Sequence, residues 1–379
     1  MGYRTPGNSS GGPPLPLVVA VDCPSGVDCD SGAAAPETIP ARLTVCMEAV
    51  KTGLASLPAF GLAGEIQVVN LALPDNLPTT SEIRTWLVDK AMVSGVIPRR
   101  EIDSHKGRFG TLTVAAGSLS YPGAALLAGR AAYRMGAGLV QMAVPAPLHA
   151  LLPGHLPEAV WQPLPDIDGA ISSDAAQVLL NGFNRTTCLL LGPGLGQHPA
   201  TTQFLRELLL KYDLKARNIP LVLDADGLRL VALLPNWPAL LPTQSILTPH
   251  PGEMAALTGL DISDIQQDRL NIAVHYAAVW GHVVVLKGAL SIIASPDGQT
   301  CIIPVATSAL AHAGTGDVLA GMIAGLRTQK VPAFEAAWAG AYLHGQAGLL
   351  AGRILGTPAS VMASDVSSQI ASVLSEITL

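Results

Sequence analysis

The chain has 379 residues, of which 49% are hydrophobic and only 13% are charged, and its formal net charge at pH 7 is −6. This length exceeds that of one typical compact domain and favours two or three. The acidic balance, together with the lack of a basic run or an aromatic-studded basic face, argues against a nucleic-acid-binding protein.

Two apolar stretches, 119–145 and 331–356, raise the question of a membrane span. Charged side chains such as Arg130, Glu335 and Arg353 interrupt them, whereas a spanning helix needs about 20 nearly uninterrupted apolar residues. Residues 1–15 are rich in Gly, Pro and Ser and lack the apolar core of a signal peptide. We therefore expect no membrane segment, a disordered lead-in at 1–15, and a cytoplasmic protein.

The five cysteines, an odd number, follow neither the spacing of a zinc site nor that of a disulfide framework. Free or buried thiols in a reducing compartment are the interpretation that this pattern favours.

Residues 16–75 predict a small α/β unit. Short apolar runs at 17–21, 43–47 and 66–71 indicate strands, and the first of them delivers Asp22 and Ser25 into a loop. Residues 76–90 are interpreted as a linker, because the segment begins with a stretch rich in Pro, Thr and Asp.

From 91 to 379 the chain alternates between short apolar runs and helical segments, as in βαβ units. Strands are predicted at 111–115, 139–144, 188–191, 221–223, 245–247 and 283–286. Helices are predicted at 124–135, 201–212, 254–257, 269–280 and 318–326. A turn at 296–298 predicts an antiparallel hairpin at the sheet edge. The fold class is therefore α/β, a doubly wound, mainly parallel sheet with helices on both faces, and ligands are expected beyond the carboxyl ends of its strands.

Three motifs follow predicted strands directly. The glycine-rich loop 192–196 allows a ligand to approach the backbone closely, although a tight turn without a ligand explains it equally well. Asp224 and Asp226 place two carboxylates at one strand end, where they either hold Mg²⁺ or cap the next helix. His250 is held between two prolines, and Glu253 either caps the following helix or contacts a metal-bound water.

Two further motifs indicate an anion site. Lys287 ends a strand and either meets a phosphate or is solvated. The glycine turn at 314–316 opens a helix, whose free N–H groups and dipole form an anion hole. Asp317, directly behind that turn, is placed to accept the proton of a hydroxyl approaching a phosphate. A first-turn Asp that only complements the helix dipole is the alternative.

Together these residues resemble a known family. The turn at 314–317 looks like the anion hole and base of ribokinase-like folds, and the segments 104–107, 117–124, 192–196, 224–227, 248–253 and 287–288 together resemble NAD(P)H-hydrate dehydratase. The segments 19–28, 51–53 and 63–64 are similar to the last third of the NAD(P)H-hydrate epimerase domain that is fused to this dehydratase in bifunctional repair proteins.

The resemblance implies a reaction and its residues. Hydrated NADH or NADPH would be dehydrated with ADP or ATP as co-substrate and Mg²⁺ screening the phosphates, and Asp317 would be the catalytic base. Substrate contacts are implied for Ala124, Gly194, Gly196, His250 and Asp317. Nucleotide contacts are implied for Lys287, Gly288, Ala289, Leu290, Ser291, Gly314, Thr315 and Gly316. Asp224 and Glu253 are the candidate Mg²⁺ ligands, and a homo-oligomer, a tetramer in the family, is expected.

In the front segment, Asp22 matches an epimerase position that contacts substrate and Ser25 one that contacts K⁺. The substrate and cation loops that normally precede them are not present in this sequence, so we expect no independent epimerase activity. Two alternatives to the dehydratase stay open: a ribokinase-like kinase that phosphorylates a vitamin-type alcohol, and a non-catalytic nucleotide-binding module.

Overall fold

The computed structural model describes residues 16–74 and 83–378. Contacts within the chain divide it into two units, with the boundary between Leu87 and Val88. The predicted lead-in 1–15 and the first part of the predicted linker lie outside the described residues. Residues 85–87 of that linker segment form strand β4, and helix α3 begins at Lys90, where the Asp89 side chain accepts a hydrogen bond from Met92 N.

The first unit contains a small parallel sheet in the order β1-β2-β3. Its strands are β1 (Val19–Val21), β2 (Leu43–Met47) and β3 (Glu65–Val69), and one helix, α1 (Ala59–Ala63), precedes β3. Cys46, Leu54, Ala59 and Ala63 form its buried core. A core of this size buries little apolar surface, so this unit has a much smaller hydrophobic contribution to its stability than the second.

The larger sheet has ten strands in the order β4-β15-β14-β13-β12-β11-β10-β5-β6-β7. All of them except β4, which ends at the boundary, belong to the second unit. The strands are β4 (Thr85–Leu87), β5 (Thr111–Ala115), β6 (Leu139–Pro145), β7 (Val160–Leu164), β10 (Cys188–Leu191), β11 (Leu221–Leu223), β12 (Ile246–Leu247), β13 (Val283–Leu286), β14 (Ile292–Ala294) and β15 (Thr300–Ile302). The neighbouring strands in the part β13-β12-β11-β10-β5-β6-β7 of this sheet all pair in parallel. This confirms the predicted mainly parallel α/β fold.

The predicted hairpin is present, because β14 pairs antiparallel with both β13 and β15. It does not form the edge of the sheet, since β4 is the outermost strand beyond β15. The sequence analysis missed β4 and β7, and also the two-residue strands β8 (Asp166–Ile167) and β9 (Ala170–Ile171), which form a separate small sheet. Strands of two or three residues are too short to show a period-2 pattern, and β7 has five residues of mixed exposure with Pro163 among them.

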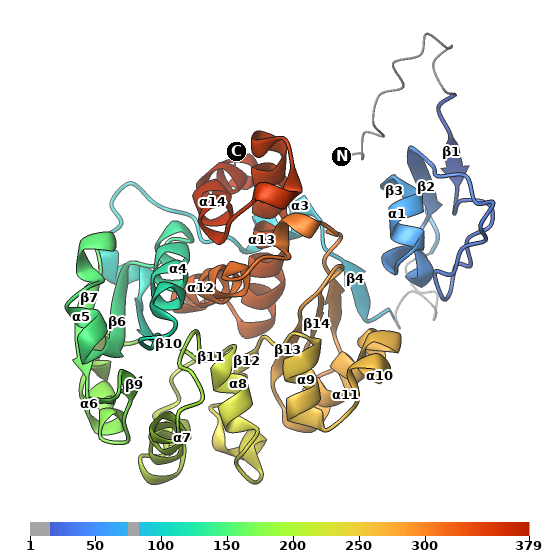
Figure 1. Ribbon diagram of the computed structural model, residues 1–379. Helices are drawn as coiled ribbons and strands as arrows, with labels where there is room; N and C mark the ends of the chain where they lie inside the picture. The colour runs from blue at the N-terminus through green and yellow to red at the C-terminus, as the bar shows by residue number, and fades with distance from the viewer. Residues whose placement is uncertain (1–15, 75–82, 379) are drawn as a thin grey trace. The chain divides into compact units, whose positions relative to one another are not determined.

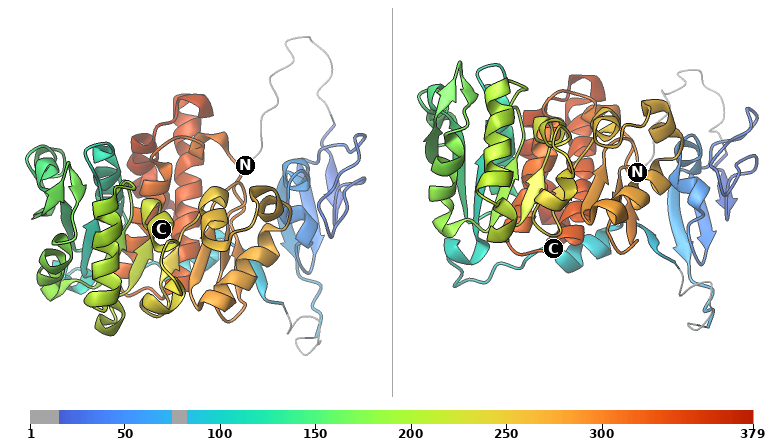
Figure 2. Two further views of the ribbon diagram at one scale, coloured as in Figure 1. Left: turned by 60° about the horizontal axis from the view of Figure 1, so that its bottom comes forward. Right: turned by 90° about the horizontal axis from the view of Figure 1, so that it is seen from below.

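Helices cover both faces of the large sheet (Figure 1). One face carries α4 (Pro122–Arg134), α12 (Thr315–Thr328), α13 (Ala333–Leu355) and α14 (Ala363–Thr378), with α3 (Lys90–Val96) beside α13 and α14. The other carries α6 (Ala175–Asn181), α7 (Pro199–Arg206), α8 (Asp226–Val231), α9 (Pro251–Thr258), α10 (Ile262–Gln267) and α11 (Arg269–Trp280), and α5 (Ala146–His149) follows β6. Figure 2 shows this second set of helices from their own side.

The strand order reverses between β5 and β10. The chain runs from β5 outward to β6 and β7, and then returns to β10 and continues through β11, β12 and β13 in the opposite direction. In open parallel sheets such a reversal leaves a crevice at the carboxyl ends of the two diverging strands, and ligands bind there. A ligand is therefore expected at the loops after β5 and β10 and at the strand ends next to them.

Helix α12 begins at this crevice and is held in place by close packing against α4. A Cβ atom on Gly321 would lie 2.2 Å from the carbonyl oxygen of Ala128, and one on Gly325 would lie 2.9 Å from that of Ala132. The two helix backbones thus touch where each helix presents its smallest residues.

We expect Gly321→Ala to destabilise the protein by about 1–3 kcal/mol, because the added methyl group must push the two helices apart. Denaturant unfolding of the whole chain measures the change. Gly95→Ala is the matched control, since Gly95 lies in helix α3 with no atom within 4 Å of the added carbon. An unchanged midpoint for Gly321→Ala would show that the helix contact is not close.

Candidate functional site

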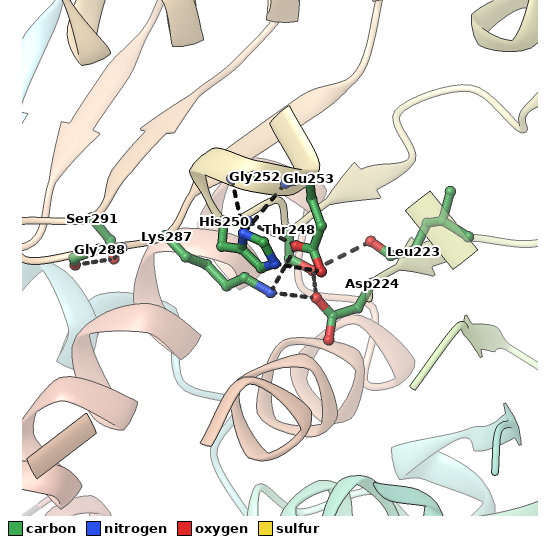
Figure 3. A network of polar contacts seen from close by, with 9 residues as sticks. All are labelled: Leu223, Asp224, Thr248, His250, Gly252, Glu253, Lys287, Gly288 and Ser291. Carbon is green, nitrogen blue, oxygen red and sulfur yellow. Dashed lines mark hydrogen bonds and ion pairs between the residues drawn. The ribbon is translucent and has the colours of Figure 1, made fainter. Parts of the chain in front are cut away.

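Four polar side chains meet at the carboxyl ends of β11, β12 and β13 (Figure 3). Asp224 follows β11, Thr248 follows β12, and Lys287 follows β13. Lys287 Nζ lies 2.7 Å from Asp224 Oδ1 and 3.5 Å from Glu253 Oε2. Thr248 Oγ1 donates to the same Asp224 oxygen at 2.6 Å. Parallel strands bring residues that are far apart in sequence to one edge of the sheet.

The charges in this cluster are buried and depend on one another. Asp224 and Glu253 are almost fully buried. Burial raises the pKa of Glu253. Burial by itself would lower the pKa of Lys287, but the carboxylates of Asp224 and Glu253 outweigh it and the pKa of the ammonium is raised. Lys287 therefore stays charged and compensates the two carboxylates in a place from which water is largely excluded.

Asp224 and Glu253 are the candidate Mg²⁺ ligands, and this role stays a prediction. In this arrangement both carboxylates lie next to the ammonium of Lys287, which compensates part of their negative charge. Glu253 Oε2 also accepts a hydrogen bond from His250 N at 2.8 Å. In the ranges 16–74 and 83–378, no group of three or more His, Cys, Asp or Glu side chains is placed to hold a metal ion. Mg²⁺ commonly binds through one or two carboxylates together with substrate phosphates.

His250 is the N-cap of helix α9, a role that the sequence analysis did not assign to it. Its Nδ1 accepts hydrogen bonds from Gly252 N at 3.0 Å and Glu253 N at 3.3 Å, and the Glu253 side chain completes a capping box. Its Nε2 lies 3.2 Å from Glu253 Oε1 and carries the proton. The pKa of His250 is lowered to about 4, mainly by burial and to a smaller extent by the positive charges of Lys287 and Arg229. The ring is thus neutral, fixed in one tautomer and still 45% exposed.

The predicted anion hole is the first turn of α12. Gly314 is the N-cap with a φ of +88° and offers no side chain to the free N–H groups. A Cβ atom on Gly316 would lie 3.6 Å from Lys287 Nζ, so the ammonium faces this turn. The hydroxyl of Thr315 points away from the turn, because it donates to the carbonyl oxygens of Leu310 and His312. Backbone N–H groups, a helix dipole and a lysine therefore converge on one anion position.

Asp317 is partly buried at this helix start. The pKa of its carboxyl group is raised to about 7, mainly by burial and next by the negative charge of Asp224. Lys287 opposes the rise, whereas Asp226 and Glu253 contribute to it. The side chain is thus electrostatically coupled to the cluster at the strand ends, and at neutral pH it is balanced between its two protonation states, as a general base requires.

The loop after β10 lies at the crevice between β5 and β10. Gly192 has a φ of +129°, and a Cβ atom on it would lie 1.8 Å from the carbonyl oxygen of Asp224, so only glycine fits there. A Cβ atom on Gly194 would lie 2.7 Å from that of Ala124 at the start of α4. Gly196 N donates to Asp226 Oδ2 at 2.9 Å. The structure therefore places Ala124 beside Gly194, and Gly196 beside the strand end that carries Asp224.

The loop 287–291 begins at Lys287 and turns back at once. Gly288 N and Ser291 Oγ are 3.2 Å apart, Ser291 Oγ donates to Gly288 O at 2.9 Å, and Leu290 N donates to Val305 O at 2.9 Å. The side chain of Leu290 is buried. Five of the residues with implied nucleotide contacts lie in this loop. The groups of the loop that can meet a ligand are its backbone and the side chains of Lys287, Ala289 and Ser291.

Comparisons with known proteins show the family to which the chain belongs. The family model described as NAD(P)H-hydrate dehydratase matches residues 112–371. The chain belongs to the NAD(P)H-hydrate dehydratase family. A second model, described as the N-terminus of YjeF-related proteins, matches residues 8–53.

Individual relatives give the same result. The chain is similar to the bifunctional NAD(P)H-hydrate repair enzyme of Moorella thermoacetica, with 41% identity over 92% of this chain. It spans 65% of that relative's length. It also resembles a crystal structure of the ADP/ATP-dependent NAD(P)H-hydrate dehydratase of Bacillus subtilis co-crystallised with ATP/Mg²⁺, at 31% identity and a TM-score of 0.65 over 80% of this chain and 100% of that one. A ribokinase-like protein of Enterococcus faecalis gives 26% identity and a TM-score of 0.65 over 77% of this chain and 96% of that one.

In this member of the dehydratase family, Asp22 lies in the first unit and already has partners. Its carboxylate accepts a hydrogen bond from Met47 N at 3.0 Å and forms an ion pair with Lys51. The hydrogen bond from Lys51 lowers the pKa of Asp22. Ser25 lies on the exposed loop that follows. Substrate contact by Asp22 and K⁺ contact by Ser25 stay predictions.

Arg269, at the start of α11, is a residue of this dehydratase-family site that the sequence analysis missed. Its guanidinium donates to Leu286 O at 3.1 Å and to Ala289 O at 2.9 Å, across the turn at Gly288. Burial lowers its pKa. Nothing in the sequence around position 269 indicates this contact, because the partners lie 17 and 20 residues later in the chain.

We expect Arg269→Lys to loosen the loop 287–291, because a lysine cannot reproduce the forked pair of hydrogen bonds. Amide hydrogen exchange in the segment 288–291 should become about tenfold faster or more, the scale of one or two lost charged hydrogen bonds. Arg206→Lys, at an exposed position of α7, is the control. Exchange at wild-type rates would mean that Arg269 does not hold the loop.

The raised pKa of Asp317 also predicts a stability effect. The ordinary pKa of an Asp side chain is 3.8, and that of Asp317 in the folded protein is about 7. At pH values between these two, Asp317 keeps a proton in the folded protein that it has lost in the unfolded chain. Wild-type stability therefore falls as pH rises through this window. Asp317→Asn removes the charge, so its melting temperature should exceed that of the wild type by a few degrees at about pH 8 and by much less at about pH 5. Asp103→Asn, at an exposed loop position, should show no such pH-dependent gap.

Proposed function

We propose that this chain dehydrates hydrated NADH or NADPH with an adenine nucleotide, ADP or ATP, as phosphoryl donor. The observation that carries the proposal is the position of Asp317, with a pKa near 7, directly behind a helix start that faces Lys287. Membership of the dehydratase family and the similarity to an enzyme co-crystallised with ATP/Mg²⁺ support it.

The reaction solves a leaving-group problem. Hydroxide leaves a carbon atom poorly, whereas a phosphate leaves well. The ring hydroxyl of the hydrated nicotinamide attacks the terminal phosphorus of the nucleotide, and the bond between that phosphorus and the bridging oxygen breaks. The carbon–oxygen bond of the new phosphoester then breaks, phosphate departs, and loss of a proton from the ring restores its conjugated double bonds. The nucleotide ends one phosphate shorter and the former hydroxyl oxygen leaves in the phosphate.

Each of the site residues has a separate role in this proposed reaction. Asp317 accepts the proton of the ring hydroxyl as the oxygen attacks phosphorus. The N–H groups of the turn 314–316 and the ammonium of Lys287 stabilise the charge that gathers on the phosphoryl oxygens. The hydrated dinucleotide lies against Ala124, Gly194, Gly196 and the exposed edge of His250, and the nucleotide against the loop 287–291. A neutral His250 donates a hydrogen bond from Nε2 without adding charge.

An activity assay with hydrated NADH tests the proposal, with ADP and ATP compared as donors and the recovery of NADH followed by its absorbance. Asp317→Asn should lower turnover by ~10²–10⁴-fold, the usual scale for a general base, while nucleotide affinity changes by only a few fold. Wild-type turnover should fall as pH drops below about 7, because Asp317 becomes protonated.

The products separate this proposal from its alternatives. Release of free phosphate in step with NADH indicates the dehydratase. A stable phosphoester without NADH would indicate a ribokinase-like kinase that acts on an alcohol. A thermal shift with ADP and Mg²⁺ but no turnover would indicate a nucleotide-binding module. Near-normal turnover of Asp317→Asn would remove the general-base role while leaving the reaction itself intact.

A further inference from the structure

Two cysteines of the first unit lie in direct contact. The sulfur atoms of Cys23 and Cys29 are 2.8 Å apart, and both residues are partly exposed. The other three cysteines, Cys46, Cys188 and Cys301, are buried. Cys23 and Cys29 are thus a pair of adjacent thiols that a reagent in solution can reach.

The backbone around this pair is held in place by hydrogen bonds. Cys23 N donates to Val21 O at 2.9 Å, and Gly53 N donates to Cys29 O at 2.7 Å. The carboxylate of Asp28 accepts hydrogen bonds from the backbone N–H groups of Asp30 and Ser31. The loop between the two cysteines therefore presents the sulfurs to each other as part of the folded unit.

A disulfide requires little movement from this arrangement. Its sulfur–sulfur bond is about 2.05 Å long, so rotation of one side chain that moves a sulfur by less than about 1 Å closes the gap. A zinc site would need three or four protein ligands, and the sulfur of Cys46, the nearest further thiol of this unit, is directed at the carbonyl oxygen of Asp22. Oxidation to a disulfide is the chemistry that this pair supports.

We propose that Cys23 and Cys29 are a modification site at which a small-molecule disulfide of the glutathione class closes a reversible intrachain disulfide. One protein thiol gives its proton to water and its sulfur attacks the small disulfide, releasing one small thiol. The second protein sulfur, also after losing its proton, attacks the mixed disulfide and releases the other small thiol. Two protein thiols are oxidised and one small disulfide is reduced to two thiols, so atoms and electrons balance.

The bond would close the loop that carries Ser25 and would tie the end of β1 to the segment before β2. Cross-linking removes conformational freedom from the unfolded chain. The oxidised first unit should therefore resist unfolding better than the reduced one. This inference concerns only the first unit and does not depend on the dehydratase activity.

Peptide mapping of the whole chain tests it. Native protein is incubated with oxidised glutathione, free thiols are alkylated, and endoproteinase Asp-N is used to cut before Asp22, Asp28 and Asp30. The two cysteines then lie on separate peptides, 22–27 and 28–29. We expect these peptides to be recovered joined, with a loss of two hydrogens, and to separate when a reductant is added. Recovery of both peptides alkylated, or each with its own glutathione, would overturn the proposal.

Variants provide the matched controls. Cys23→Ser and Cys29→Ser should each leave a stable glutathione adduct on the remaining cysteine, because no second thiol is there to displace it. Cys301→Ser, at a buried position of β15, should leave the joined peptides unchanged. A disulfide between either cysteine and Cys46 in wild-type protein would also contradict the pairing. If a serine variant does not fold, the wild-type map alone decides.

Discussion

A single buried ammonium holds the candidate active site together. Lys287 contacts the carboxylates of both Asp224 and Glu253. Lys287 follows β13 and Asp224 follows β11, so the two residues are 63 positions apart in the chain, but their strands lie on either side of β12 in the sheet. Two carboxylates brought this close without a cation would repel each other and lose their hydration. With the lysine present, the strand ends can form a polar crevice in an otherwise apolar sheet.

The same charge connects the parts of the site that act on a ligand. Lys287 faces the first turn of α12, and the glycines of that helix allow it to lie against α4. Asp317 is destabilised in its charged form by burial and by the carboxylates, and the lysine limits this effect, so that its pKa comes to about 7. One arrangement of charges thus links the strand ends, the first turn of α12 and Asp317.

Most of the contacts that hold the loops of the site join a side chain to main-chain groups. His250 caps α9 with its ring nitrogen, Arg269 holds the carbonyl oxygens on both sides of Gly288, and Asp226 holds Gly196 N. Each of these side chains fixes the main chain of a loop or of a helix start. Such an arrangement explains why short, glycine-rich loops can form a site with few charged side chains pointing into it.

The sequence by itself determined the strand-helix alternation, the mainly parallel sheet and the motifs after β10, β11, β12 and β13, because these depend on local hydrophobic period and on residues whose backbone preferences are strong. It also indicated Asp317, through the glycine turn before it. Only the tertiary structure decided that Lys287 compensates the two carboxylates proposed as metal ligands, that His250 is a neutral helix cap and that Arg269 secures a loop 17 to 20 residues away. These contacts arise from strand order, which brings distant chain segments to one edge, and no local pattern records which partner a side chain will meet there.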